Sequence, residues 1–266
     1  MKKVFFLVLL CCLIVNPVFG TDVIKLATTT STDNSGLLKA LFPAFEKKYD
    51  VRVDVIAVGT GKAIKLGENG DVDVILVHAR DAEDKFVADG FGVNRRDVMF
   101  NDFVILGPKN DPAKVKSAKN AADALKKIAS SQFTFISRGD DSGTDKKEKA
   151  LWKAAGIAPA GKWYNAVGQG MGATLQIANE KQGYTLADRG TYLAYLNKID
   201  LAVVFEGDQA MFNPYGVIAV NPALYPDSNY LGAMQLIGWV TSVPGQKIIK
   251  DFQINGKPLF IPSAVK

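Results

Sequence analysis

Apolar and polar residues alternate along the first third of the chain with two periods, one typical of strands and one typical of helices. Residues 23–27, 51–57 and 71–77 alternate or run apolar over short lengths, which predicts three strands. Leucine and phenylalanine recur three or four residues apart over 37–45, which predicts a helix with Pro43 as a candidate kink. Strands that alternate with helices favour a parallel sheet covered by helices.

The rest of the chain repeats this organisation. Further strands are expected over 99–108, 133–136 and 215–220, and further helices over 121–129, 145–155, 170–180 and around Met234, Ile237 and Val240. Two β/α units joined by the segments 103–106 and 215–220 predict two lobes with a ligand cleft between them. We expect residues 21–105 and 214–266 to form lobe one and residues 106–213 to form lobe two.

Three turns between a predicted strand and a predicted helix are rich in small and hydroxyl residues. They comprise residues 28–36, 58–62 and 137–144, and the last also contains Arg138. Ligands of α/β proteins bind at the carboxyl ends of parallel strands, where the first N–H groups of a helix have no intrahelical partner. Arg138 adds a permanent positive charge. The pattern predicts an oxyanion site, although one such turn alone is equally typical of a helix capped by Ser142 or Thr144.

The first residues have the pattern of a cleavable secretory signal. A basic head, an apolar run over 4–15 and Pro17-Val-Phe-Gly20 predict a signal peptide over 1–20 and a mature chain that starts near Thr21. The apolar run is shorter than the ~20 residues that span a bilayer. Both cysteines lie in this segment, so we expect a mature periplasmic protein without disulfides or thiolate metal sites.

The charge of the mature chain limits the choice of partners. Removal of Lys2 and Lys3 leaves 30 basic and 27 acidic side chains, a net charge of +3. This mild excess is not typical of a nucleic-acid-binding surface, so no nucleic-acid partner is expected. No exposed apolar helix is evident, and we expect a monomer that needs no cofactor.

Six segments together carry a resemblance to a known family. They are Thr28-Thr-Thr-Ser-Thr32, Val58-Gly-Thr-Gly-Lys62, Val98-Met-Phe-Asn-Asp-Phe103, Ser137-Arg-Gly-Asp-Asp-Ser-Gly-Thr144, Gly168-Gln-Gly-Met-Gly172 and Asp188-Arg-Gly-Thr-Tyr192. As a set, and over essentially the whole mature chain, they resemble the periplasmic tungstate-binding proteins of tungstate ABC importers.

This resemblance implies a type II periplasmic-binding-protein fold, in which two α/β lobes close on the ligand. It implies capture of tungstate, and also of molybdate, for delivery to a membrane ABC permease. The oxyanion site that it implies draws Thr29, Thr30 and Ser31 from lobe one and Arg138, Ser142, Gly143 and Thr144 from lobe two. We add Thr60 and Arg189 as predictions of our own, because they lie in the other polar turns.

Phosphate is the main alternative ligand. The pattern Arg138-x-Asp140-x-Ser142-Gly-Thr144 also resembles the anion turn of phosphate-binding proteins. Tungstate carries no proton and only accepts hydrogen bonds, whereas hydrogen phosphate carries a proton that one carboxylate can accept. The orientation of Asp140 and Asp141 therefore separates the two ligands, and we expect both carboxylates to turn away from the ligand.

A secreted phosphatase or esterase is the remote alternative. The chain has one histidine, His78, which with Asp73 and Ser142 suggests a triad. It has no Gly-x-Ser-x-Gly segment, however, and His78 at the end of a strand is more typical of a hydrogen-bonded structural residue. We therefore expect a binding protein and no enzyme.

Overall fold

The computed structural model describes residues 22–265, so the expected signal peptide lies outside the described residues. Lobe one contains β1 (Asp22–Thr29), α1 (Thr30–Asn34), α2 (Leu37–Tyr49), β2 (Val51–Val58), α3 (Thr60–Asn69), β3 (Val74–Val77), α4 (Arg80–Ala88), α9 (Tyr230–Val240), α10 (Val243–Asp251), β10 (Gln253–Ile254), β11 (Lys257–Pro258) and β12 (Ile261–Pro262).

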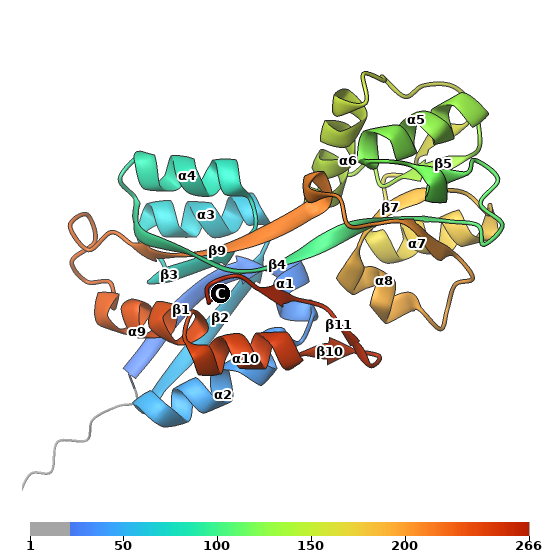
Figure 1. The fold of residues 1–266 in the computed structure, drawn as a ribbon. Helices are drawn as coiled ribbons and strands as arrows, with labels where there is room; N and C mark the ends of the chain where they lie inside the picture. The colour runs from blue at the N-terminus through green and yellow to red at the C-terminus, as the bar shows by residue number, and fades with distance from the viewer. Residues whose placement is uncertain (1–21, 266) are drawn as a thin grey trace, which may run out of the picture.

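Lobe two contains η1 (Val115–Ser117), α5 (Ala121–Ser131), β5 (Phe135–Ser137), α6 (Gly143–Ala154), β6 (Tyr164–Ala166), α7 (Met171–Glu180), β7 (Thr185–Asp188), α8 (Arg189–Tyr195), β8 (Ala202–Phe205) and η2 (Gln209–Met211). Two long strands, β4 (Gly92–Gly107) and β9 (Phe212–Val220), run between the lobes (Figure 1). The two-lobed α/β fold predicted from the sequence is confirmed.

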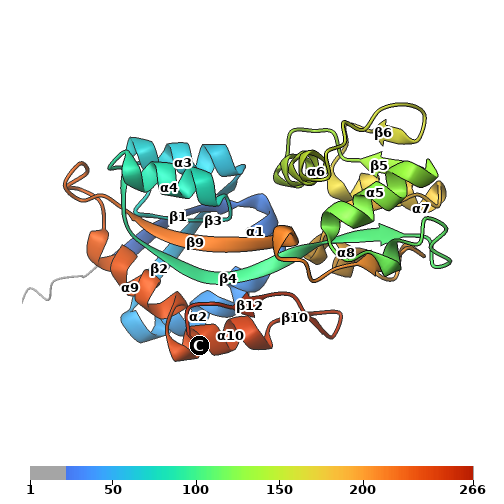
Figure 2. The ribbon, with the colours of Figure 1, turned by 45° about the horizontal axis from the view of Figure 1, so that its top comes forward.

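The large sheet has the strand order β12-β4-β9-β3-β1-β2. β1 pairs in parallel with β2 and β3, as the strand–helix alternation predicted, whereas β9 is antiparallel to β3. Helices lie on both sides of this sheet, with α3 and α4 on one side and α2, α9 and α10 on the other (Figure 2). All four residues of β3 are therefore buried, as is typical of a strand covered on both faces.

The strand expected over 71–77 begins only at Val74, because the residues before it form a turn. In that turn the buried carboxylate of Asp73 accepts the backbone N–H groups of Lys25 and Asn229, both at 2.7 Å. The helix predicted over 37–45 begins at Leu37, contains Pro43 and continues to Tyr49.

The hydrogen-bond partner of β4 changes where the chain passes from one lobe to the other. β4 pairs with β9 from Gly92 to Asp102, and from Phe103 onward it pairs with β7 and β8. β9 begins at Phe212, opposite Asp102. We propose that the lobes meet at this change of partner, slightly before the boundary at 105/106 expected from the sequence and close to the one at 213/214.

The C-terminal segment adds a contact between the lobes. β10 and β11 form a small antiparallel hairpin after α10. Its turn residue Asn255 donates from Nδ2 to the Leu193 carbonyl of α8 at 2.7 Å. Gly190 of α8 also lies against Leu259, so closely that an added Cβ would be 3.4 Å from the leucine side chain. The C-terminal segment of lobe one therefore contacts α8 of lobe two, in addition to the connection through β4 and β9.

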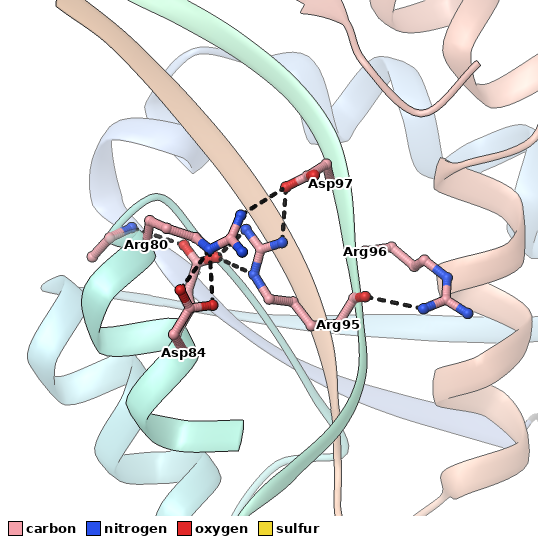
Figure 3. A network of polar contacts seen from close by, with 7 residues as sticks. Arg80, Asp84, Arg95, Arg96 and Asp97 are labelled. Carbon is pink, nitrogen blue, oxygen red and sulfur yellow. Dashed lines mark hydrogen bonds and ion pairs between the residues drawn. The ribbon is translucent and has the colours of Figure 1, made fainter. Parts of the chain in front are cut away.

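A buried ion pair fixes α4 to β4. Arg95 lies 2.7 Å from Glu83, whose side chain is 0% exposed, and also pairs with Asp97 at 2.8 Å. Arg80 and Asp84 of α4 form a neighbouring exposed pair, and Arg96 points away to the Arg95 carbonyl (Figure 3). Burial raises the pKa of Glu83, and the Arg95 charge opposes that shift. The positive charge of Arg95 therefore compensates for the burial of the Glu83 carboxylate.

We predict that Arg95→Met lowers the free energy of unfolding by about 3–5 kcal/mol, because it leaves a buried carboxylate without its partner. Chemical denaturation followed by circular dichroism measures this. Arg52→Met is the matched control, because Arg52 pairs with Asp54 in solvent at 60% and 47% exposure and should change stability by less than about 1 kcal/mol. Equal stability of the two variants would contradict the prediction.

Candidate functional site

The lobe-one turn follows directly from the end of β1. Thr29 is only 3% exposed, and its Oγ1 accepts the N–H of Thr32 at 3.2 Å, so it is the N-cap of α1. Thr30 and Ser31 are exposed in the first turn of this short helix. The structure thus gathers the three predicted residues in one turn, with Thr30 and Ser31 at the surface and Thr29 beneath them.

A cluster of hydroxyl groups and one imidazole lies under this turn. Thr29 Oγ1 is 3.0 Å from Ser31 Oγ and 2.6 Å from Thr32 Oγ1. His78, which follows β3, places Nε2 3.2 Å from Thr29 Oγ1 and 3.4 Å from Ser31 Oγ. No sequence pattern predicted that His78 lies here, because Thr29 and His78 follow separate strands of the sheet, β1 and β3.

The hydrolase triad considered from the sequence is not assembled. His78 Nδ1 faces the amide of Asn213, at 3.0 Å from Oδ1, where a triad needs a carboxylate. Asp73 precedes β3, at the opposite end from His78, and its carboxylate is used by two backbone N–H groups. His78 is therefore a hydrogen-bonded lobe residue, as expected.

The lobe-two turn connects β5 to α6. Ser142 is the N-cap of α6, and its Oγ accepts the N–H of Asp145 at 3.3 Å. This cap uses a lone pair of the oxygen and leaves the hydroxyl proton for another acceptor. Gly143 is exposed, with open space where a Cβ would stand, whereas Thr144 is 6% exposed. Both the cap and the anion interpretations of this turn are therefore compatible, because they use different parts of the same hydroxyl.

Arg138 is held in this turn by a carboxylate. Its Nε donates to Asp140 Oδ2 at 2.8 Å, while Asp140 Oδ1 accepts the Ser142 N–H at 3.2 Å. Both side chains are 22% exposed. Burial raises the pKa of Asp140, but the hydrogen bonds from Ser142 and the charge of Arg138 outweigh it and hold the pKa below its usual value. The carboxylate is therefore ionised at neutral pH, and it holds the Nε of Arg138.

Asp141 has a different environment from Asp140. Its side chain is 80% exposed and lies 3.5 Å from Lys146. Its backbone adopts a left-handed conformation, with φ at 58°. The buried Asp145 accepts the Asp141 N–H at 3.1 Å, which fixes this bend of the turn.

The two weaker predictions have different outcomes. Thr60 is the first residue of α3 and is partly exposed. The N-cap residue before it, Gly59, has no side chain to cap the helix, so Thr60 remains a candidate. Arg189 was predicted as a ligand donor, but its Nε and Nη2 donate to the Asp102 carboxylate, and Nη2 also donates to Glu206. These bonds raise the pKa of Arg189 and commit the guanidinium to joining β4 with lobe two. We therefore propose that Arg189 joins β4 to lobe two and that Arg138 supplies the charge for the ligand.

Lys147 of α6 is a half-buried cation that the sequence pattern did not indicate. Its Nζ donates to the carbonyl groups of Ala210 and Phe212 at 3.1 and 3.2 Å, where η2 leads into β9. Burial lowers its pKa. The helix that starts at the lobe-two turn is thereby bonded to the start of a crossing strand.

Between residues 22 and 265, no hydrogen bond joins the turn of lobe one to the turn of lobe two. Over the same residues, no helix is long and apolar enough to cross a membrane. Nor does this part of the chain gather three or more His, Cys, Asp or Glu side chains in a group suited to a metal ion.

Comparison with known proteins agrees with this architecture. Residues 19–243 match the model of the PBP superfamily domain. The tungstate-binding protein TupA of Peptoclostridium acidaminophilum is 49% identical over 247 residues, which cover 91% of this chain and 86% of that protein.

Two solved structures are also similar to this chain. One is a tungstate ABC transporter structure from Geobacter sulfurreducens, with 61% identity, a TM-score of 0.76, and coverage of 86% of this chain and 98% of that one. The other is the tungstate-binding protein TupA of Desulfovibrio alaskensis G20, with 48% identity, a TM-score of 0.88, and coverage of 91% and 99%. The chain therefore belongs to the PBP superfamily and, within it, to the family of the tungstate-binding proteins TupA.

Proposed function

We propose that this protein captures tungstate between its two lobes in the periplasm and delivers it to a membrane ABC permease. The observation that carries the proposal is the lobe-two turn, where Arg138 is oriented by an ionised Asp140 beside the start of α6. The similarity to tungstate-binding proteins over nearly the whole chain supports the choice of ligand. We propose the same site for molybdate, which has nearly the same size and charge.

The chemistry of the proposed donor set suits a dianion that has no proton. Ser142 uses an oxygen lone pair for its cap and has a hydroxyl proton to donate, and the first N–H groups of α6 belong to Gly143 and Thr144. Asp140 occupies the Nε of Arg138, which leaves the two terminal nitrogens of the guanidinium for the ligand. Thr30 and Ser31 would donate from the opposite lobe, above the capping residue Thr29.

Phosphate is the less favoured ligand because Asp140 and Asp141, the two carboxylates expected to distinguish the ligands, are directed to other partners. A site for hydrogen phosphate benefits from a carboxylate that accepts the ligand proton. Both oxygens of Asp140 already accept hydrogen bonds, and Asp141 extends into solvent beside Lys146. Sulfate would be disfavoured by size, because a smaller oxyanion cannot reach donors on both lobes at once.

Binding to both lobes explains how capture can signal to a transporter. A ligand that contacts both turns stabilises the closed arrangement of the lobes over the open one, and a permease can recognise that arrangement. We propose that the protein acts as a monomer, without a nucleic-acid partner or a cofactor, and is exported by a cleaved signal peptide.

We predict that tungstate and molybdate raise the melting temperature of the mature protein, and that sulfate and phosphate do so much less. Arg138→Gln should weaken tungstate binding about ten- to a hundredfold, since a charge-assisted hydrogen bond contributes ~1.5–3 kcal/mol. Thermal shift and isothermal titration calorimetry measure the two effects.

Arg96→Gln is the matched control for Arg138→Gln. It removes one positive charge from β4 while the Arg96 guanidinium bonds only the neighbouring Arg95 carbonyl (Figure 3), so affinity should stay within about twofold. A protein stabilised by phosphate alone would refute the proposed ligand, and an unchanged affinity in Arg138→Gln would refute the proposed site.

We predict that Asp140→Asn weakens tungstate binding by up to about tenfold, because Arg138 loses the carboxylate that holds its Nε. Asp141→Asn is the control, with a side chain 80% exposed, and should have little effect. Calorimetry distinguishes two roles for Asp140. Tighter binding of tungstate by Asp140→Asn would mean that this carboxylate faces and repels the ligand, contrary to the proposal.

A further inference from the structure

His78 connects the lobe-one turn to both crossing strands. Its Nε2 faces Thr29 and Ser31, while its Nδ1 lies 3.0 Å from Asn213 Oδ1 on β9. Asn213 in turn donates from Nδ2 to Asn101 Oδ1 on β4 at 2.8 Å. Asn101 and Asn213 are opposite each other in the ladder between β4 and β9, and they are 5% and 6% exposed. A polar chain thus runs from the point where the lobes meet to the proposed ligand turn.

The hydrogen bonds of Asn213 fix the direction of this chain. A side-chain amide donates only from nitrogen and accepts only at oxygen. In the amide orientation of the structure, the Asn213 nitrogen bonds Asn101 and its oxygen faces His78, an arrangement that corresponds to a proton on His78 Nδ1. In a neutral imidazole with Nδ1–H, the other nitrogen is an acceptor. Nε2 therefore accepts a hydroxyl proton from the turn.

The surroundings of His78 favour the neutral ring. Burial lowers the pKa of His78, opposed by the bond to Asn213 and by the charge of Asp188 at the end of β7. The other groups that face the ring are uncharged. They are the hydroxyls of Thr29 and Ser31 and the Tyr215 ring, whose centroid is 4.7 Å away.

Two hydroxyl groups of the turn, those of Thr29 and Ser31, could donate a proton to His78 Nε2. Thr29 Oγ1 has two lone pairs, which are filled when it accepts the Thr32 N–H and the proton of the Thr32 hydroxyl, whose oxygen is 2.6 Å away, so its own proton goes to another neighbour. His78 Nε2 is nearer to Thr29 Oγ1 than to Ser31 Oγ, at 3.2 against 3.4 Å. If Thr29 donates to the ring, the exposed Ser31 hydroxyl keeps its proton for a ligand. If Ser31 donates instead, the turn loses that donor.

We propose that His78 is a positioning residue, which accepts the Thr29 hydroxyl proton as a neutral Nδ1–H tautomer and so leaves the Ser31 hydroxyl free to donate to the oxyanion. Asn101 and Asn213 set this tautomer from the crossing strands. The role of Ser31 rests on the proposed function, whereas the tautomer is a property of the ligand-free protein.

The tautomer can be measured directly, because His78 is the only histidine of the chain. Long-range ¹H–¹⁵N correlation spectra of the untagged mature protein should show the neutral Nδ1–H form at pH 7 and a protonation midpoint below 6.5. The same form should persist after tungstate is added. An Nε2–H tautomer or an imidazolium at pH 7 would overturn the proposal, because either one would donate into the turn.

Two variants test the consequence for binding. His78→Phe keeps a ring against Tyr215 but has no acceptor, and we expect about tenfold weaker tungstate binding. His78→Gln supplies an amide oxygen that can accept from Thr29, and it should recover part of the loss. The melting temperature of each ligand-free variant reports on folding. Native affinity in His78→Phe would overturn the proposal.

Calorimetry and the histidine spectra together distinguish a wrong ligand from a wrong role for His78. If the native protein does not bind tungstate in the calorimeter, the proposed ligand is wrong, while the histidine spectra still decide the tautomer. If native protein binds tungstate and the tautomer is Nε2–H, the proposed function stands and the role of His78 is wrong.

Discussion

The ladder between β4 and β9 is the constraint on which the arrangement of the site depends. The ladder ends between Asp102 and Phe103, where β4 stops pairing with β9 and begins to pair with β7. Lys147 of α6 bonds the Phe212 carbonyl at this point, and His78 bonds the adjacent Asn213. Helix α6, which starts at the lobe-two turn, and His78, which contacts the lobe-one turn, are thus bonded to neighbouring residues of one strand. A change in the twist of this ladder would move the two turns relative to each other, which is what closure on a ligand requires.

Arg189 and Arg138 have different proposed roles, one structural and one in ligand binding, because their hydrogen-bond partners differ. Arg189 uses Nε and Nη2 on Asp102 and Glu206, and so it fixes β4 to lobe two. Arg138 uses only Nε on Asp140 and lies beside the exposed start of α6. The first has its charge compensated by two carboxylates, whereas the second retains donors next to N–H groups of the same turn. This difference is the basis for assigning the oxyanion to Arg138.

Sequence patterns predicted the fold well where apolar periodicity was strong, as in β2 and α2. They missed α4, because this helix is rich in charged residues and one of its buried side chains is the carboxylate of Glu83. They also placed the start of β4 too late, since the segment Asn94-Arg-Arg-Asp97 reads as a polar loop but pairs with β9 through two irregularities in register.

The candidate site was predictable as a set of turns and less so as a set of contacts. Glycine and hydroxyl residues after strands identified both turns, yet they did not show that Thr29 is a buried cap beneath Thr30 and Ser31. The partner of His78 lies 135 residues away in the chain, so only the fold reveals it. The pairing of Arg189 was equally hidden, because its carboxylates come from β4 and from the segment after β8.

The most direct measurement is an anomalous diffraction map of the tungstate complex at the tungsten edge. We predict one tungsten peak between the two turns. The oxygens of the anion should lie within hydrogen-bonding distance of Ser31 in lobe one and of Arg138 and Ser142 in lobe two. A peak bound by one lobe alone, or one with a carboxylate oxygen of Asp140 against the ligand, would contradict it.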